Sequence, residues 1–377
     1  MKKLRTGVTT GLCAAAAAKA ATAMLLSSEQ LEEQPEEQLE LVEVTAKTGA
    51  AMQLAITDIQ RRNGSVSCAV QKDAGDDPDV THGMKIFATV QKSGGEGIEL
   101  DGGEGIGRVT KPGLKVPVGH AAINPVPREM IKHAIEETCR QYSYPGGIKA
   151  VISIPGGAQV ARKTMNERLG IVGGLSILGT TGIVEPMSER AIVETIKAEI
   201  DVHLASGKRN LLMTPGNYGR DFALSELGLD ITLAVKCSNF IGEALDYACM
   251  KGVEHIKLVG HAGKLVKIAG GIMNTHSRIA DCRMEIIAAH CALAGGGIET
   301  IKQVMDCVTT EAAIEVLKQC GLNEPVWRSI GEKIGFHLTE RTKGSIVIEY
   351  IVFTQEHGVL VQSKTSEVCR GDGGAVD

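Results

Sequence analysis

Residues 255–278, HIKLVGHAGKLVKIAGGIMNTHSR, give the clearest fold signal in the chain. The apolar run His255–Val259 predicts a buried strand, Gly260–Gly263 a tight loop, and Lys264 the start of a helix. This order is typical of a parallel α/β unit, whose ligands bind beyond the carboxyl ends of the strands. The loop combines two glycines, the His261 imidazole and the Lys264 cation, so it could hold an anionic group or be an ordinary turn.

Four similar units precede this stretch. Their strands are expected at Lys149–Ile154, Leu175–Leu178, Asn210–Met213 and Ile231–Val235, each followed by a polar or glycine-rich loop. Helical patterns such as Glu189–Ala205 and Phe240–Met250 follow them. The alternation predicts a Rossmann-like, doubly wound and mostly parallel α/β sheet in residues 146–377, with all five loops at one sheet edge.

Residues 1–145 have a different pattern, which predicts an α+β domain on the substrate side. Thr9 or Thr10 can N-cap an alanine-rich helix from Gly11 to about Leu26, and the polar stretch Ser27–Gln38 then predicts an exposed loop. Strands are expected at Leu39–Ala46, Ala51–Gln60, Val66–Gln71 and Met84–Val90. A helix over Arg128–Arg140 precedes a domain boundary near Tyr144–Gly147.

The chain after Arg278 predicts a helical extension that ends in a β-hairpin. The helices are expected at Asp281–Ala294, Glu299–Val304, Glu311–Gln319 and Pro325–Leu338. Two strands, Ser345–Thr354 and Val359–Ser363, should form the hairpin and extend a sheet edge. The tail Thr365–Asp377 has the composition of a disordered terminus.

Bulk properties narrow the class of protein. The chain has 377 residues, enough for two domains, and a formal net charge of −5, which argues against a nucleic-acid partner. Its ten cysteines include no C-x-x-C pair, so we expect reduced, buried thiols such as Cys237 and Cys249 and no metal site. The apolar start is interrupted by threonines and Lys19, which favours a cytoplasmic protein without a membrane span over a signal peptide. A homo-oligomer is possible.

Three stretches of the first domain could carry chemistry. Arg5–Gly11 could bind a carboxylate or phosphate at a helix N-terminus, although capping explains its threonines equally well. Lys72–Gly83 contains four aspartates and His82, and could be a hard-cation site, an acid/base group or an exposed turn. Gly102–Gly113, with Arg108 and Lys111, is predicted to be a flexible flap over an anion or a mobile connector.

Eight strings resemble one family along most of the chain. They are TGVTTGLCAAAAAKAA (6–21), KDAGDDPDVTHG (72–83), GEGIGRVTKPGL (103–114), INPVPREMI (123–131), LGTTGIVEPMSE (178–189), TPGNYGRDFA (214–223), KCSNFIGEAL (236–245) and VGHAGKLVKIAGGIMNTHSR (259–278). In that order they closely resemble the cobalt-precorrin-5B C1-methyltransferase family of anaerobic cobalamin biosynthesis. The resemblance implies methyl transfer from S-adenosylmethionine to C1 of a cobalt-bound tetrapyrrole.

Within that resemblance, residues can be assigned to expected roles. The cofactor-binding candidates are Gly156, Gly157, Gly179, Thr180, Thr181, Gly182, Glu185, Gly260, Gly263 and Lys264. The candidates for the carboxylates of the substrate are Arg5, Thr9, Thr10, Arg108, Lys111, Arg128, Arg220 and Arg278. The candidate proton acceptors are His261, Asp77 and His82. Methyl transfer itself is mainly a problem of in-line placement.

Two functions of other classes remain open. An NAD(P)-dependent tetrapyrrole reductase would use the same type of sheet, and a non-catalytic corrinoid-binding protein would hold a tetrapyrrole without changing it. The chain lacks the D-x-H-x-x-G string of cobalt ligands that such carriers use, which disfavours the second.

Overall fold

The computed structural model describes residues 4–27 and 40–363. The chain divides into two compact units, residues 1–189 and 190–377, whereas the sequence placed a boundary near residue 145. The predicted loop Ser27–Gln38 and the predicted tail Thr365–Asp377 lie outside the described residues, apart from Ser27, which ends a helix.

Unit 1 is built on a five-stranded mixed sheet. The strand order is β4 (Thr57–Arg62), β5 (Ser65–Gln71), β6 (Lys85–Ser93), β9 (Gly147–Ser153) and β7 (Ile98–Gly102). Strand β9 pairs antiparallel with β6 and parallel with β7. The prediction that this segment, Lys149–Ile154, belongs to the parallel sheet of residues 146–377 is therefore wrong. The apolar run misled because β9 buries Ile148, Ala150 and Ile152 on one face and turns Lys149 outward, which is the alternation of a half-buried strand.

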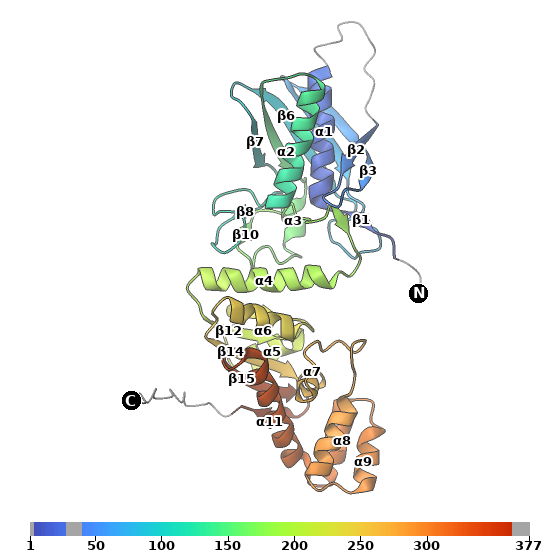
Figure 1. Cartoon of the computed structure of the whole chain (residues 1–377), viewed down its shortest axis with the longest axis vertical. Helices are drawn as coiled ribbons and strands as arrows, with labels where there is room; N and C mark the ends of the chain where they lie inside the picture. Colours follow the sequence, from blue (N-terminus) through green and yellow to red (C-terminus); the bar gives the residue numbers. More distant parts are fainter. Residues whose placement is uncertain (1–3, 28–39, 364–377) are drawn as a thin grey trace, which may run out of the picture. The chain divides into compact units, whose positions relative to one another are not determined.

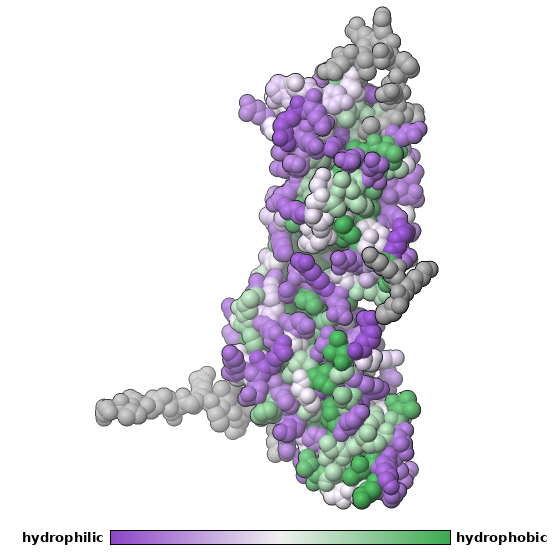
Figure 2. Space-filling model, turned by 45° about the vertical axis from the view of Figure 1, so that its right-hand side comes forward, coloured by the Kyte–Doolittle hydropathy of each residue, from purple (hydrophilic) through white to green (hydrophobic). Residues whose placement is uncertain are grey.

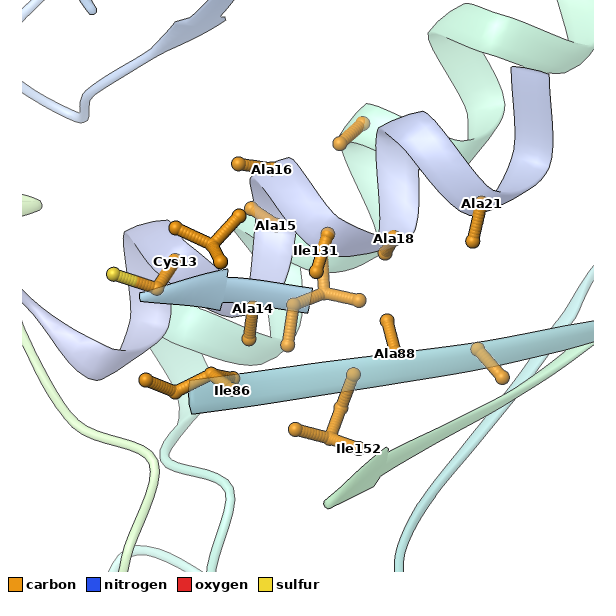
Figure 3. Packing of buried hydrophobic residues seen from close by; sticks show 14 of the residues in the cluster. Cys13, Ala14, Ala15, Ala16, Ala18, Ala21, Ile86, Ala88, Ile131 and Ile152 are labelled. Atoms are coloured by element: carbon orange, nitrogen blue, oxygen red, sulfur yellow. The ribbon is translucent and has the colours of Figure 1, made fainter. Parts of the chain in front are cut away.

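Two helices cover one face of this sheet (Figure 1). They are α1 (Thr10–Ser27) and α2 (Pro125–Gln141), and both match predicted helices. Nearly every side chain of α1 is buried, and its alanines allow α2 and the sheet to approach closely, as Figure 3 shows where Ala18 faces Ile131 of α2 and Ala88 of β6. Among the described residues α1 is the one helix long and apolar enough to cross a membrane, but it is the core helix of unit 1.

Short strand pairs extend unit 1 around its sheet. They are β1 (Gly7–Val8) with β11 (Ile183–Val184), β2 (Leu41–Thr45) with β3 (Ala51–Ala55), and β8 (Arg108–Val109) with β10 (Ile171–Val172). The predicted strand Leu175–Leu178 makes only isolated bridges, from Leu175 to Ile106 and from Ile177 to Ile123. It is therefore a packed loop and not a strand of the parallel sheet.

Unit 2 contains the parallel sheet that residues 255–278 predict. Its order is β13 (Ala234–Lys236), β12 (Asn210–Thr214), β14 (His255–His261), β15 (Val347–Thr354) and β16 (Gly358–Gln362). The first four strands are parallel, and β15 and β16 form the predicted hairpin, whose second strand is the sheet edge. Part of the predicted strand Ile231–Val235 is a 3₁₀ turn, Ile231–Leu233, started by a hydrogen bond from Thr232 N to Asp230.

Helices cover both faces of this sheet. Helices α4 (Glu189–Ala205), α6 (Ile241–Met250) and α11 (Asn323–Thr342) pack on one face around Ile256, Leu258 and the fully buried Trp327. Helix α5 (Asn217–Ser225) packs on the other, where Phe222 stacks on Phe353 with ring centroids 3.8 Å apart. The first two helices match predicted patterns, and α11 extends the predicted Pro325–Leu338.

The C-terminal extension contains three more helices, α8 (Arg283–Leu293), α9 (Ile298–Met305) and α10 (Thr310–Gln319), close to their predicted ranges. Of the side chains in α9, only that of Val304 is fully buried. Figure 2 shows apolar side chains on this part of unit 2, where Leu293, Ile298 and Val308 are more than two-thirds exposed. Helix α9 therefore contributes less to the core than α6 and α11 do.

Candidate functional site

Three loops of unit 1 meet at the N-terminus of α1, and we call them the N-terminal loop cluster: residues 5–10, 72–83 and 178–187. Val8 N donates to Asp73 O at 2.8 Å, and Thr9 N donates to Gly182 O at 3.0 Å. Glycine is required where these backbones touch, because a Cβ at Gly7 would lie 2.2 Å from the carbonyl carbon of Ala74. The cluster thus unites motifs that are far apart in the sequence.

Each aspartate of the 72–83 loop has its own partner. Asp73 pairs with the Arg5 guanidinium, Asp76 accepts from Arg5 N at 2.7 Å, Asp77 from Met187 N at 2.8 Å, and Asp79 from Lys72 Nζ at 2.7 Å. The hydrogen bond from Arg5 lowers the pKa of Asp73 to about 2. In the described part of the chain no group of three or more His, Cys, Asp or Glu could hold a metal ion. The aspartates of this loop are therefore paired within the N-terminal loop cluster.

The threonines of the cluster are used by the protein itself. Thr9 Oγ1 accepts from Leu12 N at 3.2 Å, which confirms Thr9 as the N-cap of α1. Thr10 Oγ1 accepts from Leu178 N and donates to Leu178 O, at 3.0 and 3.2 Å. Thr181 Oγ1 is bonded to Ile183 in the same way, at 2.9 and 3.2 Å. Hydroxyls so engaged fix the loops, and Thr180 and Glu185 are the exposed polar side chains beside them.

His82 also fixes backbone. Its Nδ1 accepts from Ala74 N at 3.1 Å, so the ring proton of the neutral imidazole lies on Nε2. Asp77 differs, because only its Oδ1 accepts from Met187 N and no partner is found for Oδ2 among the residues the structure describes. Of these two candidate proton acceptors, Asp77 keeps an available acceptor atom.

The first part of the predicted flap at 102–113, residues 102–109, is packed against the rest of unit 1, whereas residues 110–113 are exposed. A Cβ at Gly105 would lie 1.8 Å from Ile154 O, and a Cβ at Gly157 would lie 2.4 Å from Gly105 O. Gly156 caps the short helix α3 (Gly157–Ala161) with φ +78°. Close contacts therefore explain the glycines at 102–107, and the expectation of a flexible strip is wrong for that part of the segment.

Cations along this segment differ in availability. Arg108 pairs with Asp101 at 2.9 Å, and Arg128 donates to Leu100 O at 3.1 Å. Lys111 is exposed and makes no ion pair within the described residues. Of the three, Lys111 keeps its charge for a ligand without breaking an existing contact.

In unit 2, three loops converge at the carboxyl ends of the parallel strands, where a switch point forms between β12 and β14. The chain leaves β12 toward β13 on one side, while β14 lies on the other, and ligands of such sheets bind in the crevice at this kind of switch point. A Cβ at Gly216, after β12, would lie 3.7 Å from Lys264 Nζ, after β14. The predicted turn lies at the carboxyl end of β14, but Gly260 and His261 still belong to that strand and the short helix α7 (Ala262–Leu265) follows directly, so the predicted loop Gly260–Gly263 is wrong in its bounds.

His261 caps its own turn at this edge. Its Nδ1 accepts from Gly263 N at 3.1 Å, and its Nε2 lies 3.1 Å from Glu311 Oε1. Burial lowers the pKa of His261, and Glu311 opposes that shift only in part. Because both ring nitrogens are engaged, His261 is suited to holding the loop in place.

A basic cavity of about 340 Å³ adjoins the same turn, and its lining includes Asn239, Lys264, Lys267, Thr275, Asp281 and Arg283. Lys267 is 3% exposed and donates to the backbone oxygens of Thr275 and Ala280 at 3.2 and 2.9 Å. Sequence reasoning named Lys264 but not the other residues of this cavity. Lys267 could have indicated them, because it is a second lysine about one helical turn after Lys264.

Two further arginines of unit 2 were candidates for substrate binding. Arg278 is exposed, and its backbone N donates to His276 Nδ1 at 3.1 Å. Arg220 Nε is buried and, like Thr214 Oγ1, has no hydrogen-bond partner within the described residues. Buried polar atoms are normally satisfied, so these two identify places where a ligand could add a contact.

The predicted site residues divide between the units. Gly156, Gly157, Gly179–Gly182 and Glu185 belong to unit 1, while Gly260, Gly263 and Lys264 belong to unit 2. The prediction that all five loops share one sheet edge is wrong, because only the loops after β12, β13 and β14 do so.

Comparison with known proteins covers most of the chain. The family model described as CbiD matches residues 1–186, and the model described as CbiD, C-terminal domain, matches residues 274–364. A cobalt-precorrin-5B C(1)-methyltransferase of Ruminiclostridium cellulolyticum is 53% identical over 94% of this chain and 90% of that protein. The proteins of that name from Alkaliphilus metalliredigens and Moorella thermoacetica are each 44% identical, over 95% and 99% of this chain and 92% and 99% of theirs.

A solved structure is also similar. The crystal structure of the cobalamin biosynthesis protein CbiD from Archaeoglobus fulgidus is 29% identical, covers 74% of this chain and 83% of that chain, and has a TM-score of 0.39.

Proposed function

This chain belongs to the CbiD family, and on that premise we propose that it transfers a methyl group from S-adenosylmethionine to C1 of cobalt-precorrin-5B, giving cobalt-precorrin-6A. The observation that carries the proposal is that relatives named for this reaction are 44–53% identical to this chain over at least 94% of its length. We also propose that the reaction takes place in the cytoplasm. Cobalt enters as part of the substrate.

The crevice between β12 and β14 fits the methyl donor. Thr214 Oγ1 is a buried hydroxyl without a partner in the described residues, and a Cβ at Gly216 would meet no atom of those residues nearer than 3.7 Å. When bound there, S-adenosylmethionine supplies an already electrophilic methyl group. We propose Thr214 and Gly216 as the residues that hold it. The glycine at position 260 serves packing, because a Cβ there would lie 2.8 Å from the Leu265 side chain.

The chain's own contribution to the reaction is then placement. His261 fixes the turn after β14 through Gly263 N and is itself fixed by Glu311, so it acts as a positioning residue. Restricting the approach of two reactants can supply several kcal/mol of the barrier reduction, on the order of 7–11 kcal/mol in the best cases. Where the product must lose a proton, we propose Asp77 Oδ2 as the acceptor, because no hydrogen-bond partner for it is found among the described residues.

The test is anaerobic incubation with cobalt-precorrin-5B and methyl-labelled S-adenosylmethionine. We expect one labelled methyl group at C1 per tetrapyrrole. Absence of label in the product, with NADPH consumed instead, would select the reductase function. Binding of the tetrapyrrole with no turnover would select a carrier.

The donor site is tested separately by titration calorimetry with S-adenosylhomocysteine. Gly216→Leu places a side chain in the crevice and should weaken binding at least tenfold. Gly228→Leu is the matched control, because Gly228 also has a positive φ (+59°, against +130° for Gly216) and a Cβ there meets no atom within 4 Å. Equal affinities of the two variants would remove the crevice as the donor site.

A further inference from the structure

The basic cavity of unit 2 is built by the protein before any ligand arrives. The Lys267 ammonium ties the loop that forms one wall, through Thr275 O and Ala280 O, and lies 3.5 Å from Asp281 Oδ1. The same loop is tied to the segment after β13, because Thr275 N donates to Asn239 O at 3.0 Å. A pre-formed concave site with convergent polar groups is the usual form of a ligand-binding site.

The charges that line the cavity do not cancel. Three cations, Lys264, Lys267 and Arg283, face one carboxylate, Asp281. Arg283 holds that carboxylate with two hydrogen bonds, of 2.6 and 3.0 Å, and lowers the pKa of Asp281. The lining therefore has an excess of positive charge, which selects an anion.

Lys264 is the cation left without an anion. Its Nζ contacts Ser238 O at 3.5 Å, and within the described ranges no carboxylate lies close enough to form an ion pair with it. The side chain is partly buried, and a buried charge is costly unless it is paired. A carboxylate entering the cavity would supply the missing partner.

We propose that this cavity binds one carboxylate arm of the tetrapyrrole, an inference that rests on the proposed function. The volume, about 340 Å³, is at the lower end of the range of about 300–1,000 Å³ for ligand pockets, so it suits an arm rather than a macrocycle. The methyl donor has one carboxylate but also an ammonium and a sulfonium, so its net positive charge is repelled by the cationic lining. The tetrapyrrole, which carries several carboxylates, is attracted. The sequence analysis assigned Lys264 to the cofactor, and this proposal assigns it to the substrate.

Steady-state kinetics distinguish the two sources of the carboxylate. Lys264→Met should raise the KM for cobalt-precorrin-5B about 10- to 100-fold, the scale of one charge-assisted hydrogen bond, with little change in kcat. Affinity for S-adenosylhomocysteine should stay at the wild-type value, and Lys264→Arg should recover most of the loss in KM. The control is Lys302→Met, which removes an exposed lysine of α9 paired with Glu299 and should behave as wild type.

A second measurement needs no turnover. Tricarballylate, a small tricarboxylate, should raise the thermal stability of the wild-type chain and of Lys302→Met, but not that of Lys264→Met. An unchanged KM for Lys264→Met, or weaker binding of S-adenosylhomocysteine by that variant, would overturn the assignment to the substrate. No stabilisation of the wild type by tricarballylate would overturn the cavity as a carboxylate site. Tricarballylate stabilisation without wild-type methyl transfer would overturn the proposed function alone.

Discussion

Replacing Lys72 with methionine tests what holds the 72–83 loop, which carries Asp77. The Lys72 side chain is 1% exposed and its Nζ lies 2.7 Å from Asp79 Oδ2, while the Asp79 side chain is 26% exposed. Removing one partner of a buried pair costs about 3–5 kcal/mol, because the remaining charge loses its counterion. Asp79 keeps hydrogen bonds from the N and Oγ1 of Thr81, so we expect about 3 kcal/mol, the lower end of that range.

The cost should depend on pH in a defined direction. Burial raises the pKa of Asp79, but the hydrogen bonds from Lys72 and Thr81 outweigh it and leave that pKa below its usual value. A depressed carboxyl pKa stabilises the fold above the unfolded pKa of about 3.9, and this stabilisation is lost as pH falls through the folded pKa. In Lys72→Met the lowering by Lys72 is lost, so the pKa of Asp79 rises relative to the wild type. The difference in unfolding free energy should therefore be full at about pH 7 and shrink toward about pH 4.

Urea unfolding followed by circular dichroism measures the difference in unfolding free energy at both pH values. Thermal unfolding gives a second measurement: at about 2–4 °C per kcal/mol for a unit of this size, the Tm should fall by roughly 6–12 °C at neutral pH. The control is Lys85→Met, whose pair with Asp58 is 44% and 35% exposed and should contribute at most about 1 kcal/mol. A cost for Lys72→Met below about 1 kcal/mol, or one that does not shrink in acid, would refute the reasoning.

Three further predictions concern other parts of the chain. Gly105→Ala should destabilise unit 1 by about 3 kcal/mol more than Gly119→Ala in urea unfolding, because both glycines have a positive φ but only the first Cβ would meet backbone, Ile154 O at 1.8 Å; equal costs would count against the packed strip. Burial lowers the pKa of Lys264, so the KM for the tetrapyrrole should begin to rise at a lower pH than it would for an ordinary lysine. Lys264→Arg should abolish that rise, and a wild-type KM that stays constant into the alkaline range would contradict this prediction. His261→Ala should slow single-turnover methylation about 10²-fold at saturating ligands with the fold intact, since the turn after β14 loses its anchor; wild-type rates would exclude a positioning role.

The helices and the parallel strands of unit 2 could be predicted because their patterns are local. Strand β14 follows a turn and buries Ile256, Leu258 and Val259, and α4 has the predicted bounds Glu189–Ala205. Pairing partners are not local. The run 149–154 has the composition of a parallel strand, but its neighbours β6 and β7 come from the preceding 65 residues of chain. The sheet assignment, and with it the domain boundary, therefore depended on contacts that the pattern does not contain.

Glycine motifs were ambiguous for a related reason. Gly157 and Gly260 suggested backbone left free for a ligand and Gly105 a flexible strip, yet a Cβ at each would meet protein atoms within 3 Å. Gly216 is different, because the atom nearest to its Cβ is the flexible end of Lys264 at 3.7 Å. A glycine identifies a close approach, and only the fold shows whether the approaching group is the chain itself or could be a ligand.

The same limit applies to the candidate bases, and it explains which of them the reaction could use. A sequence gives the residue type, whereas proton acceptance depends on which lone pair the fold leaves open. His82 and His261 each give Nδ1 to a backbone N–H, and the second also places Nε2 against Glu311. Asp77 gives up one of its two oxygens to Met187 N and retains the other. Methyl transfer from a sulfonium needs no base to activate the methyl group, so the two histidines can serve geometry while proton removal, where it is needed, falls to a carboxylate.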